Sequence, residues 1–374
     1  MTNAALLRWQ QLRRAAYRRL PLFLSDYIDG GAGDELALQR NRLDLDAIKL
    51  RPRVLRQMTD VSSTTEILGC ECSMPVVVAP TGLNTLIARN GDVTLAQAAN
   101  RAGIPFILST ASFTPIRELR AHVDLPPWFQ LYAQNPALTE HLVRQALLAD
   151  CPVLVLTVDT PTGGIRWRDG RNNFRVRPSR QMMAQTLFRP RWLSQYLIGE
   201  LSERLRPKRQ QLSDDLLERK LDRSFDWDDC ARLRDKWPRR LVLKGILSAE
   251  DAARAATMGV DGVVVSNHGG RQFDAAPSSW RVFSEIKQAV PAGMTLLVDG
   301  GIRTGDDVVR ALALGAKGVL IGRLPLWALA AGGSKTLDAM FLSLAKQIII
   351  TMTLLGCQSP REVDSSRILE DWPG

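Results

Sequence analysis

The chain has 374 residues, of which 45% are hydrophobic, so it can bury a large core and does not have the composition of a disordered protein. Its 49 lysines and arginines outnumber its 39 aspartates and glutamates, and the formal net charge of +10 suits an anionic partner such as nucleic acid, an acidic membrane surface or a small anion. The five cysteines form no CxxC pair and no cluster with histidine, which indicates reduced thiols in a cytosolic protein and no zinc site. No uncharged apolar run approaches the roughly 20 residues that span a bilayer.

Residues 1–73 are expected to form a mixed lead-in to the main domain. Helical patterning covers residues 4–20 and 21–28, and an extended part follows at residues 48–54. The start of the chain carries five arginines and no acid before Asp26, a composition that resembles a transit peptide. We favour a first helix of the folded protein, because the pattern continues without a break into the sequence Asp26-Tyr27-Ile28-Asp29-Gly30-Gly31.

From residue 74 onward the chain repeats a unit of short apolar strand, polar loop and amphipathic helix. Eight strands are predicted, at residues 75–79, 105–108, 128–131, 153–157, 241–244, 262–265, 295–298 and 318–321. Ser248 and Thr304 each precede acidic residues, a pattern typical of helix N-caps. Eight such units predict an α/β fold, a (β/α)8 TIM barrel with its active site at the carboxyl ends of the strands. A doubly wound open sheet is the alternative, but no early G-x-G-x-x-G motif follows the first strand.

Polar or glycine residues follow almost every predicted strand, and one stretch among them combines a base with a cation. Of the three histidines, only His268 stands where a strand meets a loop, followed by Gly269, Gly270 and Arg271. His122 and His141 lie in helical stretches and are expected at the surface. The last two strand ends supply glycines and an arginine each, which favours a phosphate site there, in Asp299-Gly300-Gly301-Ile302-Arg303 and Gly322-Arg323.

One loop is far too long for a barrel connection. More than sixty residues separate Thr160 from Asp226, and arginines and lysines flank an apolar stretch in their middle. That stretch has leucines every four residues together with Trp192, Tyr196 and Ile198, which is typical of a basic amphipathic helix in a membrane interface. A lid or a subunit contact would use the same face, but the tryptophan and tyrosine favour the membrane. We therefore expect one domain, with lead-in 1–73, barrel 74–374 and insertion 175–225.

These residues together resemble the FMN-dependent α-hydroxy-acid-oxidising family, which includes glycolate oxidase, L-lactate dehydrogenase and mandelate dehydrogenase. The resemblance covers roughly residues 9–368. Within the family the chain is most similar to the bacterial membrane-associated L-lactate and (S)-mandelate dehydrogenases, which carry a similar insertion with a Pro-Arg-Trp sequence, here Pro190-Arg191-Trp192. The motifs that carry the resemblance are Asp26-Tyr27-Ile28-Asp29-Gly30-Gly31-Ala32, Ala79-Pro80-Thr81-Gly82-Leu83, Leu108-Ser109-Thr110-Ala111-Ser112, Phe129-Gln130-Leu131-Tyr132, Thr157-Val158-Asp159, Leu243-Lys244-Gly245, Ser266-Asn267-His268-Gly269-Gly270-Arg271-Gln272, Asp299-Gly300-Gly301-Ile302-Arg303 and Ile321-Gly322-Arg323.

The resemblance implies a role for each site residue. His268 would be the base that takes a proton from a 2-hydroxy acid, and Asp159 would hold its ring and stabilise its cation. Arg166 and Arg271 would bind the substrate carboxylate, a role to which a planar guanidinium is suited. Tyr27 and Tyr132 would hydrogen-bond the carboxylate and the reacting oxygen. The remaining residues would bind FMN: Ala79, Pro80 and Thr81 through backbone, Ser109, Gln130, Thr157, Lys244 and Ser266 at the ring's polar edges, and Asp299, Gly301, Arg303, Gly322 and Arg323 along the ribityl phosphate.

The chain departs from the family at the expected pocket mouth. Many relatives have Gly-Arg-Arg-Glu where this chain has Gly164-Ile165-Arg166-Trp167, and Leu-Asp-Gly where it has Phe273-Asp274-Ala275. Ala111 replaces a bulky residue of the short-chain glycolate oxidases, and Ala79 matches the lactate-type members. These differences bear on the identity of the substrate rather than on the chemistry.

The expected function is oxidation of an L-2-hydroxy acid, similar to lactate or mandelate, to the 2-keto acid, with electrons passed to quinone or another acceptor. The resemblance also implies a homo-oligomer, by analogy a tetramer, located in the cytoplasm and peripherally on the inner membrane. No nucleic acid is expected, because the basic residues concentrate in the insertion without a nucleic-acid-binding motif. The alternatives are a soluble oxidase that uses oxygen and a non-catalytic barrel that binds an anion.

Overall fold

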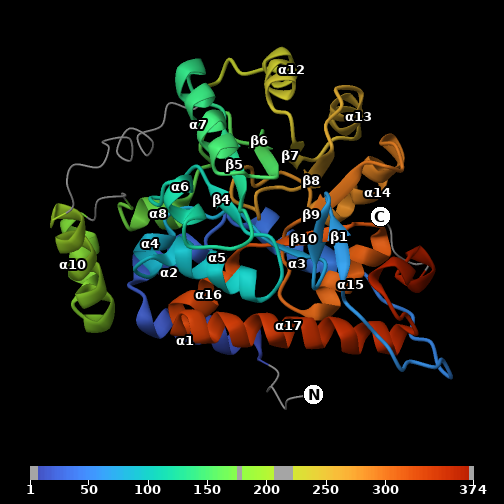
Figure 1. Ribbon diagram of the computed structural model, residues 1–374. Helices are drawn as coiled ribbons and strands as arrows, with labels where there is room; N and C mark the ends of the chain where they lie inside the picture. Colours follow the sequence, from blue (N-terminus) through green and yellow to red (C-terminus); the bar gives the residue numbers. More distant parts are fainter. Residues whose placement is uncertain (1–6, 175–178, 206–221, 370–374) are drawn as a thin grey trace.

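The computed structural model describes residues 7–174, 179–205 and 222–369. Eight parallel strands form one sheet in the order β3-β10-β9-β8-β7-β6-β5-β4. Val78 of β3 forms a parallel bridge with Phe106, just before β4, so the two edges of the sheet meet and the sheet closes. The result is the (β/α)8 barrel that the sequence predicts, with helices arranged around it (Figure 1). The strands are β3 (Val76–Val78), β4 (Ile107–Ser109), β5 (Trp128–Tyr132), β6 (Val153–Thr157), β7 (Arg240–Ile246), β8 (Gly262–Val265), β9 (Thr295–Val298) and β10 (Gly318–Ile321).

Side chains alternate between the inside and the outside of the barrel, as the two-residue period of a strand requires. In β6, Val153 and Val155 belong to the cluster inside the barrel, whereas Leu154 and Leu156 pack with the surrounding helices. Both faces are buried, which explains why the strands are continuous apolar runs in the sequence. A small antiparallel hairpin, β1 (Thr65–Ile67) and β2 (Cys70–Cys72), adds its fully buried Ile67 to the inner cluster.

The helices lie outside the barrel and supply the other wall of the core. Ser248 accepts a hydrogen bond from the Asp251 amide, and Thr304 forms a capping box with Asp307, so both predicted N-caps are confirmed. The helices are α1 (Trp9–Arg19), α2 (Leu22–Asp29), α3 (Leu36–Ala47), α4 (Asn84–Ile87), α5 (Gly91–Arg101), α6 (Ile116–Arg120), α7 (Pro136–Leu148), α8 (Trp167–Arg171), α9 (Arg180–Thr186), α10 (Pro190–Leu205), α12 (Trp227–Lys236), α13 (Ala249–Thr257), α14 (Ser279–Ala289), α15 (Gly305–Leu314), α16 (Arg323–Gly332) and α17 (Ser334–Leu355), with short 3-10 turns at Pro360–Glu362 and Ser365–Arg367.

The structure differs from the prediction more in the lead-in than in the barrel. All eight predicted strands are present, with ends that differ by at most two residues. In the lead-in, helix α3 and the β1–β2 hairpin were not predicted, and the expected extended part at residues 48–54 contains only one bridge, between Leu50 and Ile368. His122 and His141 are both exposed, as expected.

Helix α17 is long and apolar enough, by length and composition alone, to cross a bilayer. It is the long red helix in Figure 1, where it lies against the other elements of the domain. Leu337, Phe341, Leu344 and Ile348 are buried, and the helix packs on α5, α15 and α16. The core of the barrel domain therefore accounts for one face of the helix, while Leu342, Ile350 and Leu354 on its other side are exposed.

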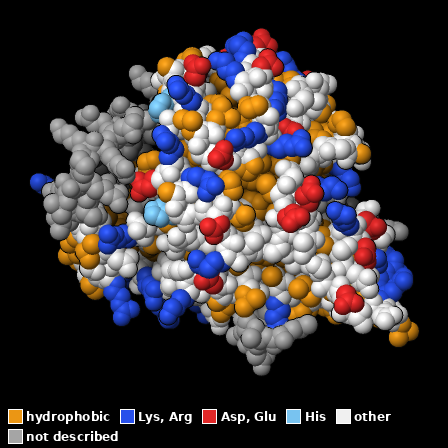
Figure 2. Space-filling model, in the orientation of Figure 1, with side chains coloured by type: hydrophobic (Ala, Val, Ile, Leu, Met, Phe, Trp, Pro, Cys, Tyr) orange, Lys and Arg blue, Asp and Glu red, His pale blue; other side chains and the backbone are white. Residues whose placement is uncertain are grey.

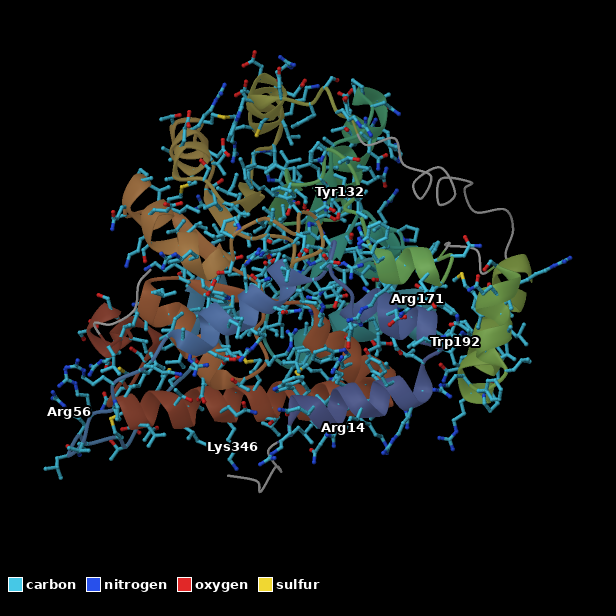
Figure 3. The ribbon with its side chains drawn as sticks, turned by 180° about the vertical axis from the view of Figure 1, so that it is seen from behind. Arg14, Arg56, Tyr132, Arg171, Trp192 and Lys346 are labelled. Atoms are coloured by element: carbon cyan, nitrogen blue, oxygen red, sulfur yellow. The ribbon has the colours of Figure 1, made fainter. Side chains whose placement is uncertain are left out.

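The predicted insertion 175–225 contains α9 and α10, while residues 175–178 and 206–221 lie outside the described part of the chain. Its first helices are attached to the lead-in by polar contacts. Gln185 accepts a hydrogen bond from the Phe23 amide at 2.9 Å, and Arg189 donates to the Leu20 carbonyl at 2.9 Å. Trp192 is buried and donates its indole N–H to the Leu86 carbonyl at 2.8 Å. Trp192 thus lies on the side of α10 that faces the barrel, not on an outer face as the membrane argument assumed (Figure 3).

Candidate active site

A continuous set of polar side chains occupies the carboxyl end of the barrel, because parallel strands release their ends at one edge. Ser109 of β4 donates to Gln130 Oε1 of β5 at 2.9 Å, and Gln130 Nε2 donates to Thr157 Oγ1 of β6 at 3.0 Å. Farther round, Lys244 of β7 donates from Nζ to Ser266 Oγ at 3.0 Å and pairs with Asp299 Oδ2 at 3.2 Å. All six residues are buried. The structure therefore brings together the residues that the resemblance assigns to the polar edges of a flavin.

The predicted base and its partner meet across the barrel end. His268 Nδ1 lies 3.0 Å and 3.1 Å from the two carboxylate oxygens of Asp159, and its backbone N–H donates to Ser266 Oγ at 3.0 Å. Burial alone would raise the pKa of the Asp159 carboxyl, but the charge and hydrogen bond of His268, with the charge of Lys244, lower that pKa below its ordinary value. Asp159 is thus a stable anion beside the imidazole. Because Nδ1 is held by the carboxylate, Nε2 is the ring atom that can accept a proton from a substrate.

The pairing of Asp159 with His268 depends on a glycine in the strand between them. Gly245 has a φ of +108°, and a Cβ there would lie 2.5 Å from Asp159 Cβ and Cγ. The pairing of β7 with β8 also shifts register between Lys244 and Ile246, so the strand bulges at this residue. Gly245 stands in a family motif of the sequence, but its role in making space for the carboxylate is visible only in the structure.

Two reciprocal side-chain amide hydrogen bonds attach the loop that carries His268 to helix α3. Asn41 Nδ2 donates to Asn267 Oδ1 at 2.8 Å, and Asn267 Nδ2 donates back to Asn41 Oδ1 at 2.9 Å. Asn267 Oδ1 also accepts from the Gly270 amide, which fixes the turn after His268, whose own φ is +57°. Asn41 lies in α3, the helix that the sequence did not predict, so this support could not be anticipated.

Two arginines from different loops lie close enough to repel each other. Burial, followed by the positive charge of Arg166, lowers the pKa of the Arg271 guanidinium. Arg271 Nη1 donates to the carbonyls of Tyr27 and Gly30 at 2.6 Å and 2.8 Å. Arg166 reaches Asp169 at 3.4 Å only through Nη1, while its buried Nε has no hydrogen-bond partner. Two cations with an unsatisfied donor form a site that an added carboxylate would complete.

Both predicted tyrosines belong to this anion site. The Arg271 guanidinium carbon lies 4.9 Å from the centroid of the Tyr27 ring, and the Tyr27 hydroxyl donates to the Gly82 carbonyl at 3.5 Å. Tyr132 is near enough to influence the charges of both Lys244 and Arg271. Tyr132 is the last residue of β5 and pairs with Thr157 of β6, so it stands beside the residues assigned to the flavin edge.

The expected phosphate end has two arginines whose positive charges are poorly compensated. Burial, followed by the charge of Arg42, lowers the pKa of Arg303 to about 10; burial, followed by the charges of Arg271 and Arg303, lowers that of Arg323 to about 9. Both stay protonated at neutral pH. Within residues 7–174, 179–205 and 222–369, no carboxylate oxygen lies within 4.0 Å of either guanidinium. An anion bound here would relieve an unfavourable concentration of charge.

The structure refines how Arg323 takes part in this end of the site. Its guanidinium donates to the carbonyls of Ile28, Gly269 and Gly30 at 2.9–3.0 Å, so it joins the lead-in to the His268 loop. Its backbone N–H opens helix α16, where Gly322 provides no side-chain cap. A phosphate here would meet the backbone N–H groups at the amino end of α16, while Nη1 and Nη2 of Arg323 each keep a second donor. A Cβ at Gly322 would lie 3.8 Å from the Ala79 Cβ and 3.9 Å from the Thr81 Cγ2, which places these predicted flavin contacts, with the intervening Pro80, beside the phosphate end.

The residues present fit FMN. The buried Asp299 Oδ1 has no hydrogen-bond partner, as expected of an acceptor that awaits a ligand hydroxyl. Gly301, two residues farther on, has a φ of +87°, and a Cβ there would lie 2.9 Å from the Asn41 carbonyl oxygen, so this glycine lets the loop after Asp299 pack closely on α3. Among the described residues, no group of three His, Cys, Asp or Glu is placed to hold a metal ion.

A closed (β/α)8 barrel with a flavin edge, a cationic phosphate end and a His–Asp pair beside two arginines defines a flavin-dependent oxidoreductase. Residues 16–370 match the FMN-dependent dehydrogenase family, and the chain belongs to this family. FMN is therefore its cofactor.

Similar proteins fall in two groups. The chain is 41% identical to an L-lactate dehydrogenase of Pectobacterium atrosepticum and 42% identical to one of Xanthomonas campestris pv. campestris, with at least 95% of this chain and 95% of each relative covered. Among solved structures, a monotopic membrane protein, (S)-mandelate dehydrogenase, matches with a TM-score of 0.91 and 36% identity over 98% of this chain and 100% of that one. A mandelate oxidase with (S)-2-phenylpropionate matches with a TM-score of 0.83 and 35% identity over 98% of both chains.

We predict that Arg303→Met weakens binding of FMN but not of riboflavin, because only FMN carries the phosphate that would relieve the charge at this end. A hydrogen bond to a charged group contributes about 1.5–3 kcal/mol, so the dissociation constant of FMN should rise about 10- to 100-fold. Fluorescence titration of the apoprotein with each flavin measures both constants. Arg281→Met, at an exposed arginine of α14, is the matched control. Equal losses for FMN and riboflavin would show that Arg303 acts on the fold and not on the phosphate.

Proposed function

We propose that the protein oxidises an L-2-hydroxy acid of the lactate or mandelate type to the 2-keto acid. The observation that carries this proposal is the contact of His268 with Asp159 beside the Arg166–Arg271 pair. A 2-hydroxy acid has a carboxylate next to a carbon that bears a hydroxyl and a hydrogen, and its oxidation removes two electrons and two protons. The site offers a carboxylate-binding cation pair and a base within the same small space.

The residues divide this chemistry among them. Arg166 and Arg271 bind the substrate carboxylate, and Tyr27 and Tyr132 add hydrogen bonds to the carboxylate and the reacting oxygen. This anchoring fixes the substrate with its reacting carbon near His268. His268 takes up one proton at Nε2, and the Asp159 carboxylate stabilises the imidazolium that results.

FMN, when bound, supplies the chemistry of accepting the electron pair that leaves the α-carbon. Lys244 is held between Ser266 and Asp299 with its positive charge intact, since the charges of Asp299, Asp159 and Tyr132 outweigh the effect of burial and raise its pKa. A fixed cation at that edge stabilises the negative charge that reduction brings. The same base serves whether the substrate loses its α-hydrogen as a proton or as a hydride.

We predict that one of L-lactate, L-mandelate or a longer aliphatic 2-hydroxy acid bleaches the visible flavin band of the anaerobic protein. His268→Gln should slow this bleaching about 10²- to 10⁴-fold, the usual contribution of a positioned base. The matched control is His141→Gln, which changes an exposed histidine of α7. Stopped-flow absorbance gives both rates. A yellow protein that no 2-hydroxy acid bleaches would disprove the proposed substrate class and direct attention to the exposed Ile165, Trp167 and Phe273 near the site loops.

The alternative reaction is that of a soluble oxidase that uses oxygen. We favour a dehydrogenase that passes electrons to quinone, because the L-lactate dehydrogenases and the (S)-mandelate dehydrogenase match this chain better than the mandelate oxidase does. The exposed Leu22, Leu187 and Phe188 also give an apolar surface that suits a membrane quinone. After reduction by substrate, a short-chain quinone should restore the flavin absorbance at least ten times faster than dissolved oxygen does. Fast recovery with oxygen, unimproved by the quinone, would establish the oxidase instead.

We infer that the protein associates peripherally with a membrane through the insertion. Leu187, Phe188, Leu197 and Ile198 of the insertion are each more than half exposed, and Leu22 of α2 is 50% exposed. Figure 2 shows hydrophobic side chains gathered at the edge of the molecule where α10 lies, with lysines and arginines beside them. Apolar groups rimmed by cations suit the interface of an anionic membrane. The neighbouring (S)-mandelate dehydrogenase is described as a monotopic membrane protein. A location on the inner face of the membrane, in a homo-oligomer, remains part of the same proposal.

The double variant Phe188→Glu/Leu197→Glu should lose binding to anionic vesicles, because each glutamate places a charge where apolar burial is required. Ser194→Glu/Gln195→Glu is the control, since it adds the same charge at exposed polar positions of α10. Vesicle flotation measures the bound fraction. If both variants bind vesicles as well as the wild type, the apolar face has no role in binding. If both lose binding equally, the added negative charge alone explains the loss.

A further inference from the structure

Packing on the faces of the Tyr27 ring holds this side chain more firmly than the hydrogen bond of its hydroxyl does. It stacks on Phe174 with a centroid separation of 4.9 Å and an interplanar angle of 7°, and the Arg271 guanidinium lies 4.9 Å from its centroid. The hydroxyl, in contrast, makes a hydrogen bond of 3.5 Å to the Gly82 carbonyl, at the limit of such contacts. The direction of the hydroxyl is therefore set by the two groups that pack on the ring.

Phe174 is itself placed by the loop that carries Arg166. Its backbone N–H donates to the Asp169 carbonyl at 2.9 Å, immediately after helix α8, and Asp169 is the partner of Arg166. One short segment thus contributes an arginine to the anion site and an aromatic ring that packs on the tyrosine of the same site. Neither contact follows from sequence spacing, because Tyr27 and Phe174 are far apart along the chain.

A series of rings continues from Phe174 to the insertion. Phe174 packs on Phe23 at 6.1 Å, Phe23 makes an edge contact with Trp192 at 5.8 Å, and Trp192 stacks on Tyr196 at 5.1 Å. Trp192 is anchored by its hydrogen bond to the Leu86 carbonyl. In Figure 3, Trp192 lies between α10 and the lead-in, on the same side of the molecule as Arg171 of α8. The aromatic series therefore connects α10 with the ring that packs on Arg271.

We propose that Phe174 is a positioning residue for Tyr27, and that Phe23 and Trp192 extend this support to helix α10. The inference rests on the proposed function, in which Tyr27 hydrogen-bonds the substrate carboxylate. When the contact from Tyr27 is weakened, Arg166 and Arg271 still hold the carboxylate and keep the reacting carbon near His268. The lost contact is the same in the bound substrate and in the transition state, so its loss raises KM and leaves kcat nearly unchanged. A side chain that only stabilised the fold would have no reason to produce this split.

The test compares Phe174→Ala with Phe174→Tyr, which keeps the ring, in the FMN-loaded full-length protein. Phe174→Ala should raise KM for the acid that bleaches the wild type about tenfold, with kcat within twofold. The dissociation constant of oxalate, a carboxylate that is not oxidised, should rise by the same factor when followed by the change in the flavin spectrum. Phe174→Tyr should stay within twofold of the wild type. If Phe174→Ala does not fold, Phe174→Leu keeps the apolar volume without the flat ring and should raise both constants severalfold.

The extension to α10 has its own matched pair. Trp192→Ala should weaken oxalate binding about threefold, whereas Phe188→Ala, at an exposed aromatic of the insertion outside the ring series, should not change it. Unchanged KM and oxalate binding in a folded Phe174→Ala or Phe174→Leu protein would overturn the role of Phe174. An effect of Trp192→Ala no larger than that of Phe188→Ala would overturn the extension. A wild type that neither binds oxalate nor is bleached by any 2-hydroxy acid would instead refute the proposed function on which both depend.

Discussion

The site depends on a meeting of two loops across a strand that has no side chain at the point of contact. Asp159 follows β6 and His268 follows β8, and β7 lies between them in the sheet. Any side chain at Gly245 would occupy the space that the Asp159 carboxylate needs. The bulge at the same residue changes the direction of β7, while Lys244 still faces Ser266 and Asp299. One glycine thus allows the acid–base pair and the cation of the flavin edge to share the end of the barrel.

Repulsion among the positive charges at the end of the barrel is a second constraint on the site. Lys244, Arg166, Arg271, Arg303 and Arg323 gather at one end of the barrel, where partial burial weakens the screening of their repulsion. The cofactor phosphate and the substrate carboxylate supply the opposite charge. Ligands that bind only the folded state also stabilise it, so the FMN-bound protein should be more stable than the apoprotein. The excess positive charge of the sequence is therefore partly a property of the catalytic end, and not of the insertion alone.

The sequence predicted those parts of the structure that repeat or that lie next to a strand. Eight apolar runs defined the barrel, and the residues after them, from Ala79 to Arg323, are found together at its carboxyl end. The residues that support the site were harder to find, because their partners are distant in sequence. Asn41 meets Asn267 from an unpredicted helix, and Phe174 meets Tyr27 across more than a hundred residues. Trp192 illustrates the remaining difficulty, since a buried and a membrane-facing tryptophan have the same sequence pattern.

The attachment of the insertion limits how this protein could be shortened. Gln185 and Arg189 bind the lead-in and Trp192 binds the Leu86 carbonyl, so α9 and the start of α10 are part of the folded domain, although the exposed Leu187 and Phe188 lie among these anchors. A shortened version with a less apolar surface would keep the chain through Tyr196, with polar residues at Leu187 and Phe188, and would remove residues only beyond Tyr196. A cut at the start of α9 would instead expose Phe23 and the Leu86 carbonyl, and would leave the aromatic packing behind the substrate site without its outer support.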